Sequence, residues 1–119
     1  MNNTCVFCRI LKDPKHLDHE IVWEGEKYMA MKVIHPETEG HFIVFPKLHV
    51  SEMTDMPDPG DFFKLVVFLA EKFTKKWQAP AYVLKLNNNV YKLENDPMHV
   101  GHIHMHVMPR HVDGVLRNL

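Results

Sequence analysis

The sequence lacks a long hydrophobic run and an excess of charge, and it has only two cysteines in 119 residues. A helix that crosses a membrane needs about 20 consecutive apolar residues, so we expect no spanning segment and no membrane partner. The 14 Lys and Arg residues balance 15 Asp and Glu residues. Nucleic-acid-binding domains usually carry a strong basic excess, so we expect no nucleic-acid partner either.

Residues 1–5 lack the basic and apolar regions of a signal peptide, which favours a cytoplasmic location. In that compartment a pair of cysteines is more typical of thiols or metal ligands than of a disulfide. Hydrophobic residues make up 45% and charged residues 24%, as in ordinary globular proteins. A chain of this length is expected to form a single domain, residues 1–119.

The apolar pattern predicts an α+β fold. Aromatic and β-branched residues predict five strands, at residues 21–24, 28–34, 41–45, 82–86 and 102–108. The first three are consecutive and closely linked, which favours antiparallel pairing.

Helical spacing of apolar residues predicts one long helix, from Asp61 as its N-cap to about Trp77. Ser51 is expected to cap a short helical turn over residues 51–54, and the polar residues 87–97 are expected to form a loop. The long helix reads as a core element without chemistry of its own.

Histidine is the unusual feature of the composition: there are ten, and five lie between His99 and His111. In the strand at 102–108, alternation places His102, His104 and His106 on one side, and Ile103, Met105 and Val107 on the core side. Strand propensity does not account for three histidines in a row on one face. They could bind a catalytic zinc with an open position for water, or one imidazole could act as a nucleophile that its neighbours orient. The spacing alone does not decide between these interpretations.

Cys5 and Cys8 have the spacing of one half of a zinc site. A redox pair and two unrelated buried thiols are the alternatives, because a complete zinc site needs further ligands.

Four blocks of the sequence together resemble the histidine-triad (HIT) family of nucleotide hydrolases and transferases, in its compact zinc-containing branch. The His-x-His-x-His signature stands at 102–106, followed by two apolar residues. Residues 5–10 (Cys-Val-Phe-Cys-Arg-Ile) look like the N-terminal box of the family. Residues 40–49 look like its Gly-His-x-x-Val-x-Pro-Lys-x-His segment, and residues 106–110 match the usual end of the triad strand. The resemblance implies an antiparallel sheet of about five strands with one long helix and short N-terminal helical segments.

By this resemblance His104 is a nucleophile that attacks the α-phosphate of a nucleoside phosphate derivative and forms a covalent nucleotidyl-histidine. The substrate would be a purine nucleotide derivative such as a phosphoramidate, an adenylate or a dinucleoside polyphosphate. His106 would support His104, and His99 would take a role beside the phosphate. Asn87 matches a family asparagine near the phosphate. The resemblance places Phe7, Ile10 and Ile34 along the base pocket.

The resemblance also completes the metal site. In zinc-containing relatives two histidines join the two cysteines, and they match His49 and His102 here. With all four positions taken by protein, this zinc is expected to be structural. Compact members are usually homodimers, and by analogy we expect one here. His41 and His111 receive no role.

Two positions depart from the family pattern. Val33 stands where relatives carry an Asp that holds the ribose hydroxyls, and Met98 stands where they carry a Gln. These departures favour an alternative function, a nucleotide-binding regulatory module with little catalysis.

Overall fold

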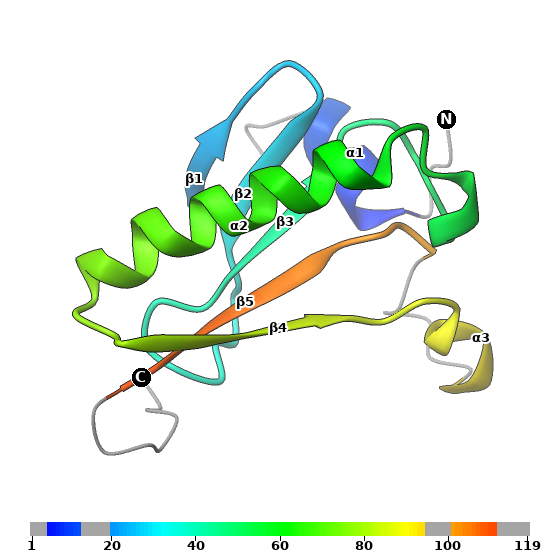
Figure 1. The fold of residues 1–119 in the computed structure, drawn as a ribbon. Coiled ribbons are helices and arrows are strands. Elements are labelled where there is room, and N and C mark those ends of the chain that lie inside the picture. Colours follow the sequence, from blue (N-terminus) through cyan, green and yellow to red (C-terminus); the bar gives the residue numbers. More distant parts are fainter. Residues whose placement is uncertain (1–4, 13–19, 95–100, 112–119) are drawn as a thin grey trace.

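The computed structural model describes residues 5–12, 20–94 and 101–111. The elements follow one another as α1 (Val6–Lys12), β1 (Ile21–Glu24), β2 (Tyr28–Lys32), β3 (Phe42–Pro46), the short 3₁₀ helix η2 (Met53–Asp55), α2 (Pro59–Lys76), β4 (Ala81–Leu86), α3 (Val90–Glu94) and β5 (Met105–Arg110) (Figure 1). The five strands form one sheet in the order β1-β2-β3-β5-β4, and every neighbouring pair is antiparallel. The predicted α+β fold with a five-stranded antiparallel sheet is therefore confirmed.

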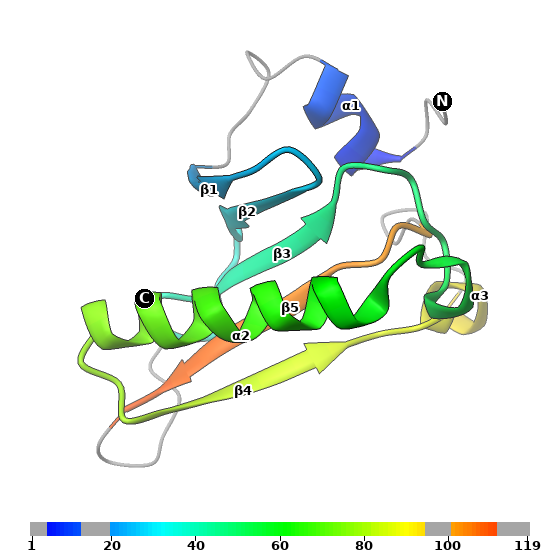
Figure 2. The ribbon, with the colours of Figure 1, turned by 45° about the horizontal axis from the view of Figure 1, so that its top comes forward.

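The sheet carries a helix on each face. Helix α2 lies along one face (Figures 1 and 2), where Phe62, Val66 and Leu69 pack against Phe42 and Val107 in the larger hydrophobic cluster. Helix α1 lies over the other face. A second cluster there consists of buried residues from α1 and the inner strands, namely Cys5, Phe7, Cys8, Ile10, Met29, Met31, Ile43 and Phe45. Side chains alternate between the two faces of a strand, so β2 and β3 contribute residues to both clusters.

Helix α2 begins earlier than the sequence predicted. Asp58, rather than Asp61, is its N-cap, because the Asp58 carboxylate accepts a hydrogen bond from the Asp61 backbone N–H at 3.0 Å. Pro59 fits the first helical position, where no backbone N–H is required. Asp61 lies in the first turn and accepts a hydrogen bond from the Tyr28 hydroxyl at 2.9 Å, which ties the helix to β2.

The triad strand is also displaced from its predicted position. Strand β5 begins at Met105 rather than His102, and it continues through Pro109. The residues before it are held by other contacts: the Ile103 N–H donates to the Val50 carbonyl at 2.7 Å. Pro109 lies beyond the last residue that pairs with β3, where β5 has only β4 as a neighbour. Proline is tolerated at such an edge because a missing N–H removes little from the ladder.

Two short segments differ from their predictions. Ser51 caps no helix: the 3₁₀ turn η2 begins after Glu52, and no side-chain hydrogen bond caps it. The predicted loop at 87–97 contains α3, and Asn89 precedes this helix with a positive φ of 63°. Asparagine adopts this conformation more readily than most residues.

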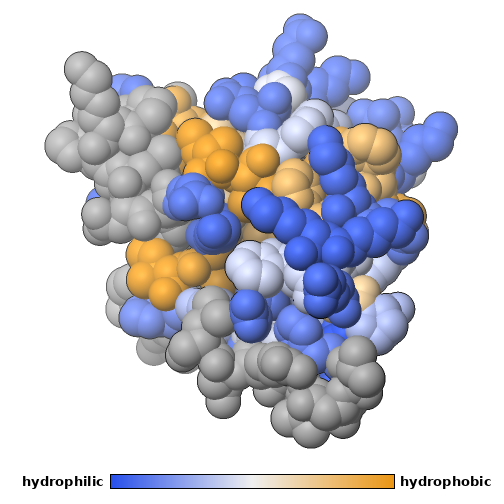
Figure 3. All heavy atoms as spheres, turned by 90° about the vertical axis from the view of Figure 1, so that its left-hand side faces the viewer, coloured by the Kyte–Doolittle hydropathy of each residue, from blue (hydrophilic) through white to orange (hydrophobic). Residues whose placement is uncertain are grey.

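The surface at the C-terminal end of α2 is mixed in character. Figure 3 shows hydrophilic residues over much of this face, with hydrophobic residues gathered in patches between them. Among the helices in the described part of the chain, none is both long and apolar enough to cross a bilayer.

Candidate functional site

Four potential metal ligands meet at the α1 face of the sheet. Cys5 directly precedes α1 and Cys8 lies in its first turn, and the Cys8 N–H donates to the Cys5 sulfur at 3.4 Å. His49 follows β3, and His102 precedes β5. One ligand atom from each residue lies within 4.8 Å of the other three. Residues almost a hundred positions apart in the sequence thus form one buried Cys2His2 cluster.

The spacing of the donor atoms suits a single ion. The Cys5 sulfur is 3.3 Å from His102 Nδ1, and the Cys8 sulfur is 3.2 Å from His49 Nδ1. Sulfur and nitrogen ligands of a tetrahedral metal, bound at about 2.3 and 2.1 Å, would lie about 3.6 Å apart. His102 Nε2 donates its hydrogen to the Pro46 carbonyl at 2.7 Å, so the Nδ1 lone pair faces the sulfurs. Such an outer hydrogen bond fixes the tautomer that a metal requires.

Burial also prepares the cluster for a cation. Desolvation lowers the pKa of His102 to about 4, so the ring is neutral near pH 7 and able to coordinate. Burial and the neighbouring Cys5 raise the pKa of Cys8 to about 11. A positive ion between the sulfurs would reverse this effect and stabilise the thiolates. The donor set therefore fits a metal that prefers mixed sulfur and nitrogen ligands.

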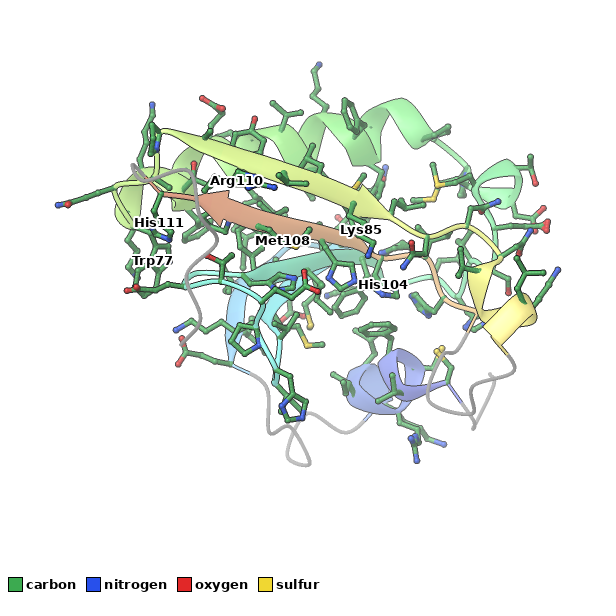
Figure 4. All side chains as sticks on the ribbon, turned by 90° about the horizontal axis from the view of Figure 1, so that it is seen from below. Trp77, Lys85, His104, Met108, Arg110 and His111 are labelled. Carbon is green, nitrogen blue, oxygen red and sulfur yellow. The ribbon has the colours of Figure 1, made fainter. Side chains whose placement is uncertain are left out.

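His104 lies next to this cluster, and a hydrogen bond to the backbone fixes its tautomer. Its Nδ1 is 2.9 Å from the carbonyl oxygen of His102. A carbonyl oxygen only accepts, so Nδ1 carries the hydrogen, and in the neutral ring the lone pair stands on Nε2. The ring contacts Phe7 of α1, with centroids 5.0 Å apart, and His106, with centroids 5.1 Å apart. Figure 4 shows His104 on the face of the sheet opposite α2.

His106 belongs to a chain of hydrogen bonds that starts at the backbone of Glu37. The Glu37 N–H donates to His41 Nδ1 at 3.1 Å. His41 Nε2 lies 2.9 Å from His106 Nδ1, so His41 Nε2 carries the hydrogen and donates it. His106 then keeps its own hydrogen on Nε2. Burial lowers the pKa of His41, and burial followed by the charges of His104 and His41 lowers the pKa of His106 to about 3.

His41 has no role predicted from the sequence, yet in the structure it is joined to His106 of the triad. Its only sequence signal was its place within the matched block at 40–49. His111, the other unassigned histidine, is buried after β5, and its Nε2 has no hydrogen-bond partner in the structure as described.

The other residues expected to bind substrate are distributed unevenly. Phe7 is buried between Phe45, at a centroid distance of 4.6 Å, and the rings of His102 and His104. Ile10 is buried in the same cluster, whereas Ile34 is 52% exposed and Val33 packs against the cluster instead. His99 and Met98 lie outside the described residues.

The asparagines after β4 have separate positions. Asn87 is exposed. The Asn88 side-chain oxygen accepts a hydrogen bond from the Met53 N–H at 2.8 Å, and the Asn89 amide donates to Glu52 at 3.4 Å. These two side chains hold the loop to η2, so Asn87 is the asparagine of the three that is left for a ligand contact.

Comparisons with known proteins agree with this geometry. The HIT domain model matches residues 15–113. An uncharacterized HIT-like protein of Methanocaldococcus jannaschii is 30% identical over 109 residues, covering 90% of this chain and 79% of that protein. The adenosine 5'-monophosphoramidase HNT1 of Saccharomyces cerevisiae is 28% identical over 111 residues, covering 92% of this chain and 65% of that protein.

Solved structures share the fold as well. A HIT family protein from Bacillus anthracis has a TM-score of 0.77 at 26% identity, covering 96% of this chain and 78% of that one. A zinc-bound histidine triad protein from Mycobacterium smegmatis has a TM-score of 0.71 at 25% identity, covering 97% of this chain and 82% of that one. The family model covers well over half of the chain, and the histidine strand, the sheet and the Cys2His2 cluster accompany it. The chain therefore belongs to the histidine-triad (HIT) family.

Proposed function

We propose that the chain, acting as one HIT-like domain over residues 1–119, is a nucleotide hydrolase or nucleotidyl transferase. It would act at the α-phosphate of a purine nucleoside phosphate derivative, namely a phosphoramidate, an adenylate or a dinucleoside polyphosphate. The observation that carries this proposal is the hydrogen bond from His104 Nδ1 to the His102 carbonyl. It leaves an imidazole lone pair on Nε2, beside a buried aromatic ring and a second histidine.

In the proposed reaction His104 Nε2 attacks the α-phosphorus and forms a nitrogen–phosphorus bond. The bond from phosphorus to the leaving group breaks, and its electron pair departs with that group, which takes a proton from solvent. The Nε2–H of His106 donates a hydrogen bond to a phosphoryl oxygen and stabilises its negative charge. Water then attacks the phosphorus, the electron pair of the nitrogen–phosphorus bond returns to Nε2, and the water proton is released.

The nucleoside would lie on the α1 side of His104. Phe7 and Ile10 supply an apolar surface for the base, and Ile34 is an exposed apolar side chain near the start of the loop that follows β2. Asn87 and His99 are proposed to contact phosphate oxygens. The HNT1 relative carries the name of an adenosine 5'-monophosphoramidase, which supports a nucleoside 5'-phosphate derivative as substrate.

We propose that the Cys2His2 cluster holds a structural zinc through Cys5, Cys8, His49 and His102. The mixed sulfur and nitrogen donors favour zinc, and four protein ligands leave no open position for water. Zinc there would tie α1 to the start of β5 and fix the His102 carbonyl that orients His104. Thiolate ligands persist in a reducing compartment, which favours a cytoplasmic location.

A homodimer is proposed on two surface features. Phe63 and Phe68 of α2 are 50% and 57% exposed. Strand β4 stands at one edge of the sheet, with β5 as its only neighbour. An exposed edge strand beside apolar side chains is a surface that a second copy can cover. Light scattering coupled to gel filtration measures the resulting mass.

The second candidate function is a nucleotide-binding module with little catalysis. Val33 favours it, because this side chain packs against the cluster around Phe7 and cannot accept a hydrogen bond from ribose. In that case nucleotides bind, but turnover by the wild type does not exceed turnover by His104→Ala.

The experiment is a substrate panel with the wild type and His104→Ala. We expect release of a nucleoside monophosphate by the wild type and a loss of at least about a thousandfold in the variant, because the nucleophile is gone. Acid quenching of the wild type during turnover should trap a protein heavier by one nucleotidyl group. His35→Ala, which removes an exposed histidine, is the matched control. Full activity in His104→Ala contradicts the proposal.

A further inference from the structure

Strand β4 carries one charged residue, Lys85, and the sheet register pairs it with His106 of β5. Side chains of paired residues in an antiparallel ladder project from the same face. The His104 ring, whose centroid is 5.1 Å from that of His106, lies on that face as well. Figure 4 shows Lys85 and His104 on the face of the sheet that is turned away from α2.

Within residues 5–12, 20–94 and 101–111, the Lys85 ammonium group forms no ion pair with a carboxylate. The ion pairs found among the described residues join Lys32 to Glu20 and Lys47 to Glu24, and neither includes Lys85. Its positive charge acts on the site, where it is one of the influences that lower the pKa of His106. A cation placed opposite a histidine disfavours a second positive charge there. Together the ammonium group and the Nε2–H of His106 make a local surface that attracts anions.

The position of Lys85 relative to His104 indicates which anionic part of the substrate it would contact. Phe7 contacts the His104 ring from α1, whereas Lys85 belongs to β4, on the other side of β5, where it pairs with His106. Figure 4 shows α1 and β4 on opposite sides of β5. If the nucleoside occupies the α1 side, as in the proposed function, the leaving group, which departs from the side of the phosphorus away from His104 Nε2, has the β4 side open to it, where Lys85 lies.

We propose that Lys85 binds an anionic leaving group, so that this site prefers nucleotide substrates whose α-phosphate is bonded to a further phosphate over phosphoramidates of cationic amines. This inference rests on the proposed function. An ammonium group attracts the oxygens of a departing phosphate and repels an amine that carries its own positive charge. Lys85 transfers no proton in this role. The bridging oxygen leaves with the electron pair of the broken phosphorus–oxygen bond, and Lys85 balances charge on the departing phosphate.

The first test compares two substrates: a dinucleoside polyphosphate and the phosphoramidate formed between AMP and the side-chain amine of lysine. The measured quantity is the ratio of their kcat/KM values. We expect Lys85→Met to lower the polyphosphate-to-phosphoramidate ratio by about tenfold or more, because one charge-assisted contact is lost. Lys85→Arg keeps the charge and should preserve the ratio within about threefold. Lys64→Met, an exposed position on α2 across the sheet, controls for the change in net charge.

A binding measurement decides the inference even without turnover. ADP carries the further phosphate that AMP lacks, so wild-type protein should bind ADP about tenfold more tightly than AMP. Lys85→Met should abolish most of this difference, and added salt should weaken ADP binding more in the wild type than in the variant. An unchanged substrate ratio, or an unchanged ADP-to-AMP preference in Lys85→Met, overturns the role of Lys85. Absence of any turnover contradicts the proposed function, while the binding comparison still judges Lys85.

Discussion

His41 Nε2 lies 2.9 Å from His106 Nδ1, although the two residues are 65 positions apart in the sequence. The backbone N–H of Glu37 fixes the other nitrogen of His41 as an acceptor. Each ring therefore has one tautomer that satisfies its neighbours, and the chain ends with the Nε2–H of His106. A backbone amide on the loop before β3 thus determines which nitrogen of His106 donates at the candidate site.

Replacing His41 should impair catalysis by releasing this tautomer. We expect His41→Ala to lower kcat by about 10- to 100-fold, with a smaller change in KM, because His106 can then carry its hydrogen on either nitrogen. His41→Gln retains an amide that can donate to His106 Nδ1, and it should recover part of the loss. Steady-state kinetics on the preferred substrate measure both effects.

Nitrogen NMR of the His106 ring separates this positioning role from a general loss of structure. The wild-type ring should show a hydrogen on Nε2, and the His41→Ala ring a mixture of tautomers. A His41→Ala protein with wild-type kcat and an unchanged His106 tautomer contradicts the role of His41.

The role of His41 could not be read from the sequence, because the contact depends on how β3 and β5 are paired. Ile43 is the partner of His106 in the register, and this pairing brings His41, the residue directly before β3, to the triad. Strands β3 and β5 are not consecutive in the sequence, and local periodicity contains no information on which distant strands become neighbours. The triad itself was visible because its spacing repeats within five consecutive residues of the sequence, 102–106.

The difference between local pattern and long-range contacts also explains which boundaries of helices and strands were predicted correctly. Strand β1 has the predicted limits, and Ile103, Met105 and Val107 enter the larger core as predicted. The predicted start of β5 at His102 was wrong. His102 contacts Pro46 and the two cysteines instead, and these tertiary contacts outweigh the local strand pattern. Helix α3 was missed because a helix of five residues has too few turns to show a period.

Removal of the metal should destabilise the folded protein, and zinc binding should not depend on His104. Chelation, or the variant Cys8→Ser, is expected to lower the melting temperature by at least about 5 °C, because the metal connects α1 with β5 only in the folded state. His104→Ala should retain one equivalent of zinc. Elemental analysis and thermal unfolding on the same samples check both statements.

One result would contradict the assignment of the four zinc ligands. If His104→Ala loses zinc while Cys5→Ala keeps it, the metal lies in the histidine row, and the interpretation of a catalytic zinc replaces the structural one.

Stability should fall on acidification between about pH 6.5 and pH 4. Burial lowers the pKa of His106 to about 3, whereas the ordinary value of 6.5 applies to the unfolded chain. Above pH 7 the ring is neutral in the folded and in the unfolded state, so its titration does not affect stability. Below pH 6.5 the unfolded state takes up a proton and the folded state does not, which favours unfolding. The free energy of unfolding thus decreases as the pH falls, by at most about 1.4 kcal/mol per pH unit for this ring, and by less where solvent screens it.

Urea unfolding between pH 7 and pH 4.5 measures this slope. His106→Asn should reduce the slope, because the group that titrates is gone. His35→Asn removes an exposed histidine and should leave it unchanged. Equal slopes for the wild type and His106→Asn would show that His106 does not titrate differently on folding.

Gly40 should be intolerant of any side chain, because its backbone and its surroundings both require glycine. Its φ is +87°, and a Cβ atom there would lie 2.6 Å from Nε1 and 2.8 Å from Cγ of the Trp77 indole. We expect Gly40→Ala to lower the free energy of unfolding by about 2–4 kcal/mol, from backbone strain and from displacement of the indole.

Gly60 provides the matched control, since the nearest atom to a Cβ there is an Asp58 oxygen at 3.6 Å. Gly60→Ala lies in the first turn of α2 and should be neutral or stabilising by up to about 1 kcal/mol. Because Gly40 directly precedes His41, Gly40→Ala should also lower kcat, and the ring of His106 should show the same mixture of tautomers as in His41→Ala. Urea denaturation and nitrogen NMR of both glycine variants test this link between the Trp77 contact and the triad. A Gly40→Ala protein as stable as Gly60→Ala would mean that the indole moves aside without strain.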